Sequence, residues 1–289
     1  MLPINKPRGL SRLSRMLLAI LMGAASPCLA VAQSLDKAKS DGVTVAIANE
    51  PPYAFMGADG SPTGAGPELD KAILATAGIT WFSGQVMEYG AMIPAVQSKR
   101  VTFASAGSLT ITPERCQAVI YSEPLICDGF AYLVPSALAD KVHNYKDIAS
   151  AGLTIGTCGG CTSQKAAIAA GIPEGKIVII PDAMSGLKLL QDGRIDVFAH
   201  SILGIADMYD TRHLVDQDKF KFVRDDTAPP SCQGAAFRKE DGDLRDAYNE
   251  GIKKVRASGE YIKILKKFNF EAASFGVDNA TTKQICAGK

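Results

Sequence analysis

The chain has 289 residues, of which 47% are hydrophobic, and its 31 lysines and arginines nearly balance its 30 aspartates and glutamates. This balance disfavours a nucleic-acid partner, which would need a basic face to neutralise phosphates.

The first 32 residues are typical of a secretory signal peptide. Residues 1–15 contain four basic residues and no acid. The apolar stretch 16–25 follows, and the segment ends at Ala30-Val31-Ala32. This combination predicts export and cleavage after Ala32, and the apolar stretch is too short for an ordinary transmembrane helix. Residues 33–289 then keep 27 basic and 30 acidic residues, a net charge of −3. Their length suits two lobes better than one core.

Strands and helices alternate in the first part of this mature sequence. Residues 43–48 are rich in β-branched side chains and predict a strand, and residues 81–87 and 101–106 predict two more. Helices are expected from Pro67 onward and over residues 91–98, because apolar side chains recur there at helical spacing. Strand, helix, strand, helix, strand predicts a parallel sheet with right-handed crossovers.

The same pattern restarts near residue 153. Strands are predicted over residues 153–156, 176–180 and 195–199, and helices over residues 162–170 and 185–191. The pattern therefore predicts two equivalent α/β lobes.

Two extended segments, residues 129–134 and 233–238, have no helix beside them and predict strands that cross between the lobes. Two helices follow, separated by a break at Ser258-Gly259 and ending near Lys267, and an irregular stretch is expected beyond Phe270. The predicted fold class is α/β, with two lobes around a cleft and two crossing strands as the hinge. Lobe 1 is expected to comprise residues 41–131 and 233–289, and lobe 2 residues 132–232.

The mature sequence holds six cysteines: Cys116, Cys127, Cys158, Cys161, Cys232 and Cys286. An even number in an oxidising compartment favours disulfides, and six cysteines allow fifteen pairings, among which the sequence does not choose. The C-x-x-C spacing of Cys158 and Cys161 also occurs in redox motifs. Because the two lie in a glycine-rich turn, a local structural clip or two free thiols is the preferred interpretation. A zinc site is disfavoured, since no second C-x-x-C pair exists.

Candidate ligand-binding residues follow the predicted strands, because α/β sheets bind ligands beyond the carboxyl ends of their strands. Glu50 and Tyr53 follow the first strand, and Tyr53 offers a flat face to a ring or a cation. Arg115 follows the third strand and could bind a carboxylate with two parallel hydrogen bonds. The structural alternatives are that Glu50 is solvated, that Tyr53 packs on lobe 1 and that Arg115 pairs with a glutamate.

Three further candidates belong to lobe 2. Thr162 starts a predicted helix, where backbone N–H groups favour an anion, although it could be an N-cap instead. His200 and Ser201 follow the last strand of this lobe. A lone histidine is more often a structural residue with satisfied hydrogen bonds, but the position at a strand end makes a ligand contact equally expected.

Four segments resemble family 3 periplasmic solute-binding proteins of ABC importers, the polar-amino-acid group. They are residues 48–53 (ANEPPY), 110–115 (TITPER), 121–124 (YSEP) and 193–196 (GRID). Within that family the sequence is most similar to ectoine- and hydroxyectoine-binding proteins. Residues 88–94 (EYGAMIP), 113–116 (PERC), 181–188 (PDAMSGLK) and 234–239 (GAAFRK) carry this closer match.

The resemblance implies a Venus-flytrap mechanism in the periplasm. The carboxylate of a small zwitterion would meet Arg115, its flat part would lie between Tyr53 and Tyr89, and lobe 2 would close over it. The closed protein would then dock on an ABC permease in the inner membrane. We expect a monomer that binds no cofactor, no metal and no nucleic acid, and that is not an enzyme.

Departures from the family pattern leave the ligand open. Amino-acid binders usually have an aspartate for the ammonium group where Ser201 stands, and its absence favours ectoine, whose delocalised amidinium could be held by Glu50 and tyrosine faces. Ectoine binders instead have an aromatic residue where Thr110 stands, and Thr110 and His200 resemble residues of amino-acid binders. A polar amino acid is the alternative ligand. Cyclohexadienyl dehydratases use the same fold, so an enzyme is the alternative class.

Overall fold

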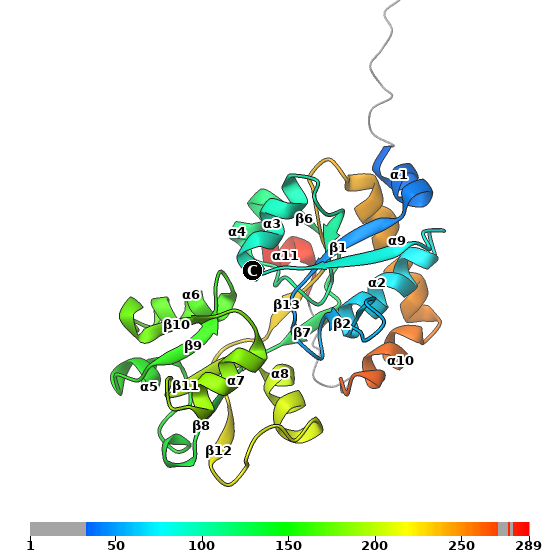
Figure 1. Cartoon of the computed structure of the whole chain (residues 1–289). Coiled ribbons are helices and arrows are strands. Elements are labelled where there is room, and N and C mark those ends of the chain that lie inside the picture. Colours follow the sequence, from blue (N-terminus) through cyan, green and yellow to red (C-terminus); the bar gives the residue numbers. More distant parts are fainter. Residues whose placement is uncertain (1–32, 271–276, 278–279, 289) are drawn as a thin grey trace, which may run out of the picture. The chain divides into compact units, whose positions relative to one another are not determined.

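The computed structural model describes residues 33–270, 277 and 280–288, so the expected signal segment 1–32 lies outside the described residues. Helices and strands alternate over most of the described chain, which forms two lobes, each with a central sheet (Figure 1). Within these ranges, no helix combines the length and the apolar character that crossing a membrane requires.

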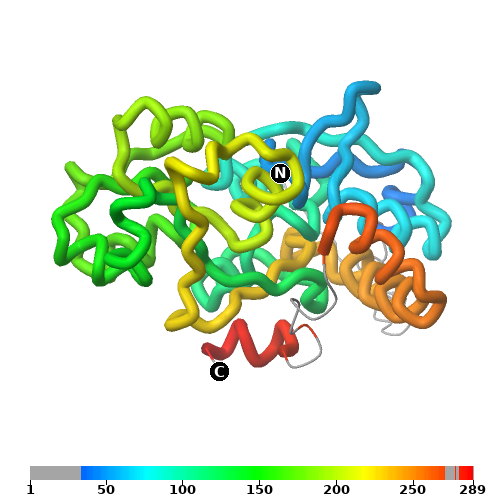
Figure 2. The backbone as a smooth tube through the Cα atoms, turned by 90° about the horizontal axis from the view of Figure 1, so that it is seen from below, coloured from blue at the N-terminus to red at the C-terminus, as the bar shows by residue number. Residues whose placement is uncertain are grey.

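The first lobe contains the elements from both ends of the described chain. They are α1 (Gln33–Asp41), β1 (Val43–Ile47), β2 (Phe55–Met56), β3 (Pro62–Thr63), α2 (Ala65–Ala75), β4 (Phe82–Val86), α3 (Tyr89–Gln97), β5 (Phe103–Ala104), α4 (Pro113–Ala118), β6 (Ile120–Tyr121), β14 (Ala236–Phe237), α9 (Gly242–Ala257), α10 (Glu260–Lys267) and α11 (Thr282–Cys286). In Figure 2 the orange helices α9 and α10 lie beside the blue and cyan N-terminal elements, and contacts of α9 with α1 and α2 agree with this view.

The second lobe and the hinge contain the remaining elements. Lobe 2 has β8 (Phe130–Pro135), a 3₁₀ turn (Ser136–Leu138), α5 (Tyr145–Ser150), β9 (Ile155–Cys158), α6 (Thr162–Ala169), a 3₁₀ turn (Glu174–Lys176), β10 (Ile177–Ile180), α7 (Ala183–Gln191), β11 (Val197–Ser201), α8 (Ile202–Ala206), a π-helical turn (Asp207–Thr211) and β12 (Phe220–Arg224). The hinge strands are β7 (Ile126–Asp128) and β13 (Ser231–Gln233).

Each sheet has five strands, in the orders β4-β1-β5-β14-β6 and β10-β9-β11-β8-β12. The three strands joined by helical crossovers are parallel in each sheet, as the alternating pattern predicts. Beyond the three strands of the predicted pattern, the lobe 1 sheet also contains β14, which is antiparallel to β5 and β6. Strand β14 enters from the hinge without a crossover helix, so nothing requires it to run in the same direction.

Each sheet is buried on both faces because successive side chains along a strand point to opposite sides. In β1, Val45 and Ile47 join the core that α2 and α9 cover, whereas Ala46 belongs to the core beneath α3. In lobe 2, Leu133 and Tyr132 divide in the same way between the two cores. This double burial explains why the strands are near-continuous apolar runs.

The two crossing strands predicted as the hinge are present, but they lie slightly earlier in the sequence. Strand β7 pairs antiparallel with β13, and Cys127 lies opposite Cys232. The predicted segments 129–134 and 233–238 instead contain β8 and β14, which belong to the sheets of the two lobes. The lobe boundaries proposed at residues 131 and 232 stay a prediction.

Three disulfides join the six cysteines of the mature sequence: Cys116–Cys286, Cys127–Cys232 and Cys158–Cys161. The local clip preferred for the C-x-x-C pair is therefore the form that the structure shows.

The irregular stretch expected beyond Phe270 is partly wrong. Residues 271–276 and 278–279 lie outside the described residues, but Thr282–Cys286 forms α11. Thr281 and Gln284 form a capping box at its start, and the Cys116–Cys286 disulfide ties it to α4. Five residues are too few for a periodic apolar pattern, which explains why the helix was missed.

Candidate functional site

A cavity lies where loops after the strands of both lobes meet. All eight predicted site residues line it: Glu50, Tyr53, Tyr89, Thr110, Arg115, Thr162, His200 and Ser201. The strand-end rule located most of these residues and the family resemblance added Tyr89 and Thr110, whereas their role in binding a ligand stays a prediction.

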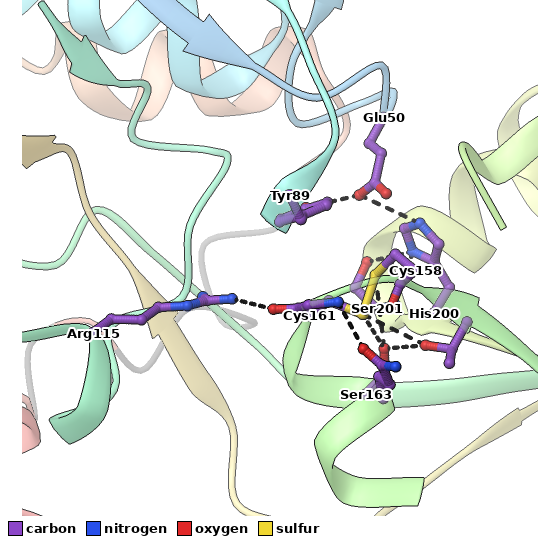
Figure 3. The surroundings of a disulfide bond; sticks show 11 residues. Glu50, Tyr89, Arg115, Cys158, Cys161, Ser163, His200 and Ser201 are labelled. Carbon is purple, nitrogen blue, oxygen red and sulfur yellow. Dashed lines mark hydrogen bonds and ion pairs between the residues drawn. A yellow bond between two sulfur atoms is a disulfide. The ribbon is translucent and has the colours of Figure 1, made fainter. Parts of the chain in front are cut away.

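Glu50 connects the two lobes across this cavity. It follows β1, and its side chain is buried rather than solvated. Its Oε2 accepts a hydrogen bond of 2.9 Å from the Tyr89 hydroxyl and lies 3.5 Å from Nε2 of His200 in lobe 2 (Figure 3). A buried carboxylate needs such partners because transfer out of water is costly.

His200 is the next-to-last residue of β11 and is 9% exposed. Its Nδ1 lies 2.8 Å from the Ser201 backbone nitrogen and 3.0 Å from the Ser201 hydroxyl, so Nε2 faces Glu50. Burial lowers the pKa of His200, but the Glu50 carboxylate and Asp128 outweigh it, so the pKa lies above the ordinary value. Because the Ser201 backbone N–H donates to Nδ1, the ring proton lies on Nε2, the nitrogen that faces Glu50.

This pairing predicts a pH-dependent stability. Because the pKa of His200 is raised in the folded state, its pairing with Glu50 stabilises the fold. That stabilisation is fully present below the ordinary pKa of 6.5 and is lost as the pH rises through the folded-state pKa. Urea unfolding at pH 6, 7.5 and 9 measures the effect. The free energy of unfolding of wild type should exceed that of His200→Gln by the largest margin at pH 6. In a Glu50→Gln background the larger margin at pH 6 should disappear. A margin that grows with pH would contradict the assignment.

Arg115 is held at the start of α4. Thr112 caps the helix through a hydrogen bond from the Arg115 backbone nitrogen, and Pro113 occupies the first turn as predicted. The guanidinium is nearly buried: Nη1 donates to the Thr110 carbonyl and Nη2 to the Gly160 carbonyl of lobe 2, both at 2.9 Å. Arg115 is therefore the second lobe-to-lobe contact in the cavity, and the structure does not show the Arg–Glu pair considered as an alternative.

Tyr53 is more buried than a stacking residue needs to be. It is 2% exposed, its ring packs edge-on against Phe270 at 5.3 Å, and its hydroxyl donates to the Asp128 carboxylate. Burial and the Asp128 charge raise the pKa of Tyr53 well above its usual range, so the hydroxyl stays protonated. Tyr53 thus packs on lobe 1, as the structural alternative held, while one side of it lines the cavity.

Asp128 is a site residue that the sequence analysis missed. It is 5% exposed at the end of β7 and lines the cavity. Besides Tyr53, the backbone N–H groups of Leu203 and Gly129 donate to it, at 3.0 and 2.8 Å. Burial raises the pKa of Asp128, and these hydrogen bonds oppose that rise without cancelling it. A single acid directly after the apolar run Leu125–Cys127 was the available signal.

The remaining lobe 2 candidates surround the turn between β9 and α6. Thr162 is the first residue of α6, but the N-cap position is Cys161, so the suggested N-cap role of Thr162 is wrong. The helix itself begins at Thr162, as predicted. Ser201 caps α8 by accepting from the Gly204 N–H at 3.1 Å.

The arrangement brings acidic and basic groups together around one cavity. Glu50 and Asp128 supply carboxyl groups, Arg115 supplies a guanidinium, and His200 becomes cationic when it is protonated. Among the described residues, no group of three or more His, Cys, Asp and Glu side chains is placed to hold a metal ion. The cavity is therefore suited chemically to a small molecule that carries both charges.

Comparison with known proteins points to a single family. The family model of bacterial extracellular solute-binding proteins, family 3, matches residues 43–272. A probable amino-acid ABC transporter periplasmic-binding protein, y4tE of Sinorhizobium fredii, is 31% identical over 90% of this chain and 88% of its own. A putative ABC transporter arginine-binding protein 2 of Escherichia coli is 28% identical over 76% of this chain and 87% of its own.

Among solved structures, the fold is similar to that of EhuB in complex with hydroxyectoine. The two share 39% sequence identity with a TM-score of 0.82, over 88% of this chain and 98% of EhuB. An ancestral arginine-binding protein bound to arginine is 25% identical, with a TM-score of 0.66, over 78% of this chain. This similarity to ligand-bound structures agrees with the expected Venus-flytrap fold.

Proposed function

Because the chain belongs to the bacterial extracellular solute-binding proteins, family 3, we propose that it captures a small zwitterion of the ectoine type in the periplasm. Proteins of this family bind small ligands and deliver them to ABC transporters, and the curated relatives are periplasmic binding proteins. We further propose that the chain is exported by its signal segment, acts as a monomer and hands its ligand to an inner-membrane permease.

The observation that carries the proposal is the placement of Glu50, Tyr89 and Arg115 around one cavity. Arg115 can form two parallel hydrogen bonds to a carboxylate, and Glu50 can pair with a delocalised cation. Tyr89 is held by its hydrogen bond to Glu50, so its ring is positioned to contact that cation. Similarity to EhuB in complex with hydroxyectoine supports the same ligand class.

Ser201 and Thr110 favour different ligands. Ser201 stands where amino-acid binders usually carry an aspartate, and its hydroxyl is already engaged in capping α8, which favours a ligand without a simple ammonium. Thr110 stands where ectoine binders carry an aromatic wall, and relatives named for arginine and histidine keep a polar amino acid as the second candidate.

Isothermal titration calorimetry of residues 33–289 separates these candidates. Ectoine or hydroxyectoine should bind more tightly than arginine, histidine and glycine betaine, by roughly tenfold or about 1.4 kcal/mol. Tighter binding of an amino acid would reject the ectoine proposal and keep the transport role.

A binding role without catalysis is the second part of the proposal. The family and the curated relatives are binding proteins. A dehydratase would need a carboxyl group as its acid or base, and both in the cavity are already engaged: Glu50 by Tyr89 and His200, and Asp128 by Tyr53 and the Leu203 N–H. Prephenate should therefore remain unconverted by the purified protein, and turnover above the uncatalysed rate would reject this part.

A further inference from the structure

The Cys158–Cys161 disulfide lies in the turn that touches lobe 1. Its two glycines form the contact: the Gly160 carbonyl accepts from Nη2 of Arg115 at 2.9 Å (Figure 3). Gly160 also approaches Gly90 of α3 so closely that a side chain carbon added there would lie 3.1 Å from the Gly90 Cα. This turn is therefore part of the surface on which the two lobes meet.

The disulfide helps to hold this turn in shape. Two consecutive glycines have little conformational preference, and Gly160 adopts a positive φ of 75°. The hydrogen bond from the Gly160 nitrogen to Gln164 Oε1, at 2.7 Å, and the bridge between the flanking cysteines restrain them. Opening the bridge removes the covalent restraint and leaves the glycines free to sample other conformations.

The same disulfide contributes least to the stability of the fold. Its cysteines are 3 residues apart in sequence, compared with 105 and 170 for the other two pairs. Stabilisation by a disulfide grows with the length of chain it encloses, so this one can open without unfolding the protein. The two thiols then stay close together, which favours re-formation.

Access and leaving-group chemistry also single out this bridge. Cys158 is half-buried and lines both the cavity and a second hollow beside Glu88 and Ile179, whereas Cys161 is 6% exposed. A thiolate released at Cys161 would lie at the start of α6, where helix dipoles favour negative charge. The Ser163 hydroxyl, 3.0 Å from this sulfur, can donate to it.

We propose that Cys158–Cys161 is a thiol–disulfide exchange site at which a dithiol reductant loosens the contact between the lobes and lowers affinity for the ligand. One reductant thiolate attacks the Cys158 sulfur, the Cys158–Cys161 bond breaks, and Cys161 leaves as a thiolate. The second reductant thiol, as its thiolate, then attacks the mixed disulfide and releases Cys158. Two electrons pass from the reductant, which becomes a disulfide, and its two protons end on Cys158 and Cys161.

The exchange step is tested without any ligand. The oxidised protein is treated with graded dithiothreitol, alkylated with iodoacetamide and mapped by mass spectrometry. Cys158 and Cys161 should be alkylated at lower reductant concentrations than the other four cysteines. Earlier alkylation of Cys127 and Cys232, or of Cys116 and Cys286, would overturn the assignment.

Loosening of the contact is tested by hydrogen exchange of the same samples. Reduction should accelerate amide exchange in peptides covering residues 157–165 and 88–92. The Cys158→Ser/Cys161→Ser variant should exchange quickly there with or without reductant, which assigns the effect to this bridge. Unchanged exchange in reduced wild type would overturn the proposed loosening.

The effect on affinity rests on the proposed function, and ectoine is the probe. Reduction should weaken binding by roughly tenfold, as expected for losing one hydrogen bond to a charged group. The double-serine variant should already bind at the weaker level and not respond to reductant. Affinities within twofold of each other would overturn the gating step. If oxidised protein does not bind ectoine at all, the ligand proposal fails, whereas alkylation and hydrogen exchange still decide the exchange site.

Discussion

Replacing Arg115 with alanine is expected to weaken binding of the captured zwitterion by at least roughly a hundredfold. The substitution removes the cationic fork proposed for the ligand carboxylate and the hydrogen bond to the Gly160 carbonyl of lobe 2. A ligand carboxylate left without its partner in a buried cavity loses more than one neutral hydrogen bond, because its desolvation is no longer offset. Calorimetry with the tightest ligand of the wild-type protein measures the effect.

Two further variants make this result specific. Arg115→Lys keeps the charge but not the planar fork, so affinity should fall less, by roughly tenfold. Glu114→Ala changes the neighbouring residue of α4, whose ion pair with Lys165 of lobe 2 is exposed, and should stay within twofold of wild type. Binding by Arg115→Ala at wild-type strength would show that the carboxylate is held elsewhere. A melting temperature close to wild type confirms that the variant is folded.

The sequence predicted the site well where one strand and one loop determine a position. Glu50 and Arg115 follow strands and His200 lies at the end of one. The apolar runs of these strands are visible in the sequence, and parallel strands bring their carboxyl ends to one edge. Two runs of this pattern predicted two lobes, and the loops after both runs line the same cavity.

What escaped prediction depends on contacts distant in sequence. Asp128 is a site residue because the Tyr53 hydroxyl and the Leu203 N–H reach it, each 75 residues away along the chain. Strand β14 is antiparallel because it enters from the hinge, which no local pattern records. Tyr53 has the same sequence signature whether it stacks on a ligand or packs on Phe270, so only the fold distinguishes the two.

Removal of the hinge disulfide is expected to cause a large loss of stability. Cys127 and Cys232 lie opposite each other in β7 and β13, 105 residues apart, and the loop between them contains the whole lobe 2 sheet. In the chain-entropy description, a bridge that closes a loop of this length stabilises the folded state by about 4–5 kcal/mol, because it restricts the unfolded chain. Cys127→Ala/Cys232→Ala should therefore lower the free energy of unfolding in urea by about 4 kcal/mol.

Cys158→Ala/Cys161→Ala is the matched control, since it also removes one disulfide and replaces two cysteines. The free energy of unfolding should fall by less than half as much in this variant, because the two cysteines are only 3 residues apart in sequence and enclose a very short loop. Equal losses would mean that the cost arises from contacts of the cysteines in the folded state rather than from the unfolded chain. The expected difference assigns separate roles to the two disulfides. The hinge disulfide determines how stable the two-lobed fold is, and the Cys158–Cys161 disulfide determines how firmly the lobes meet.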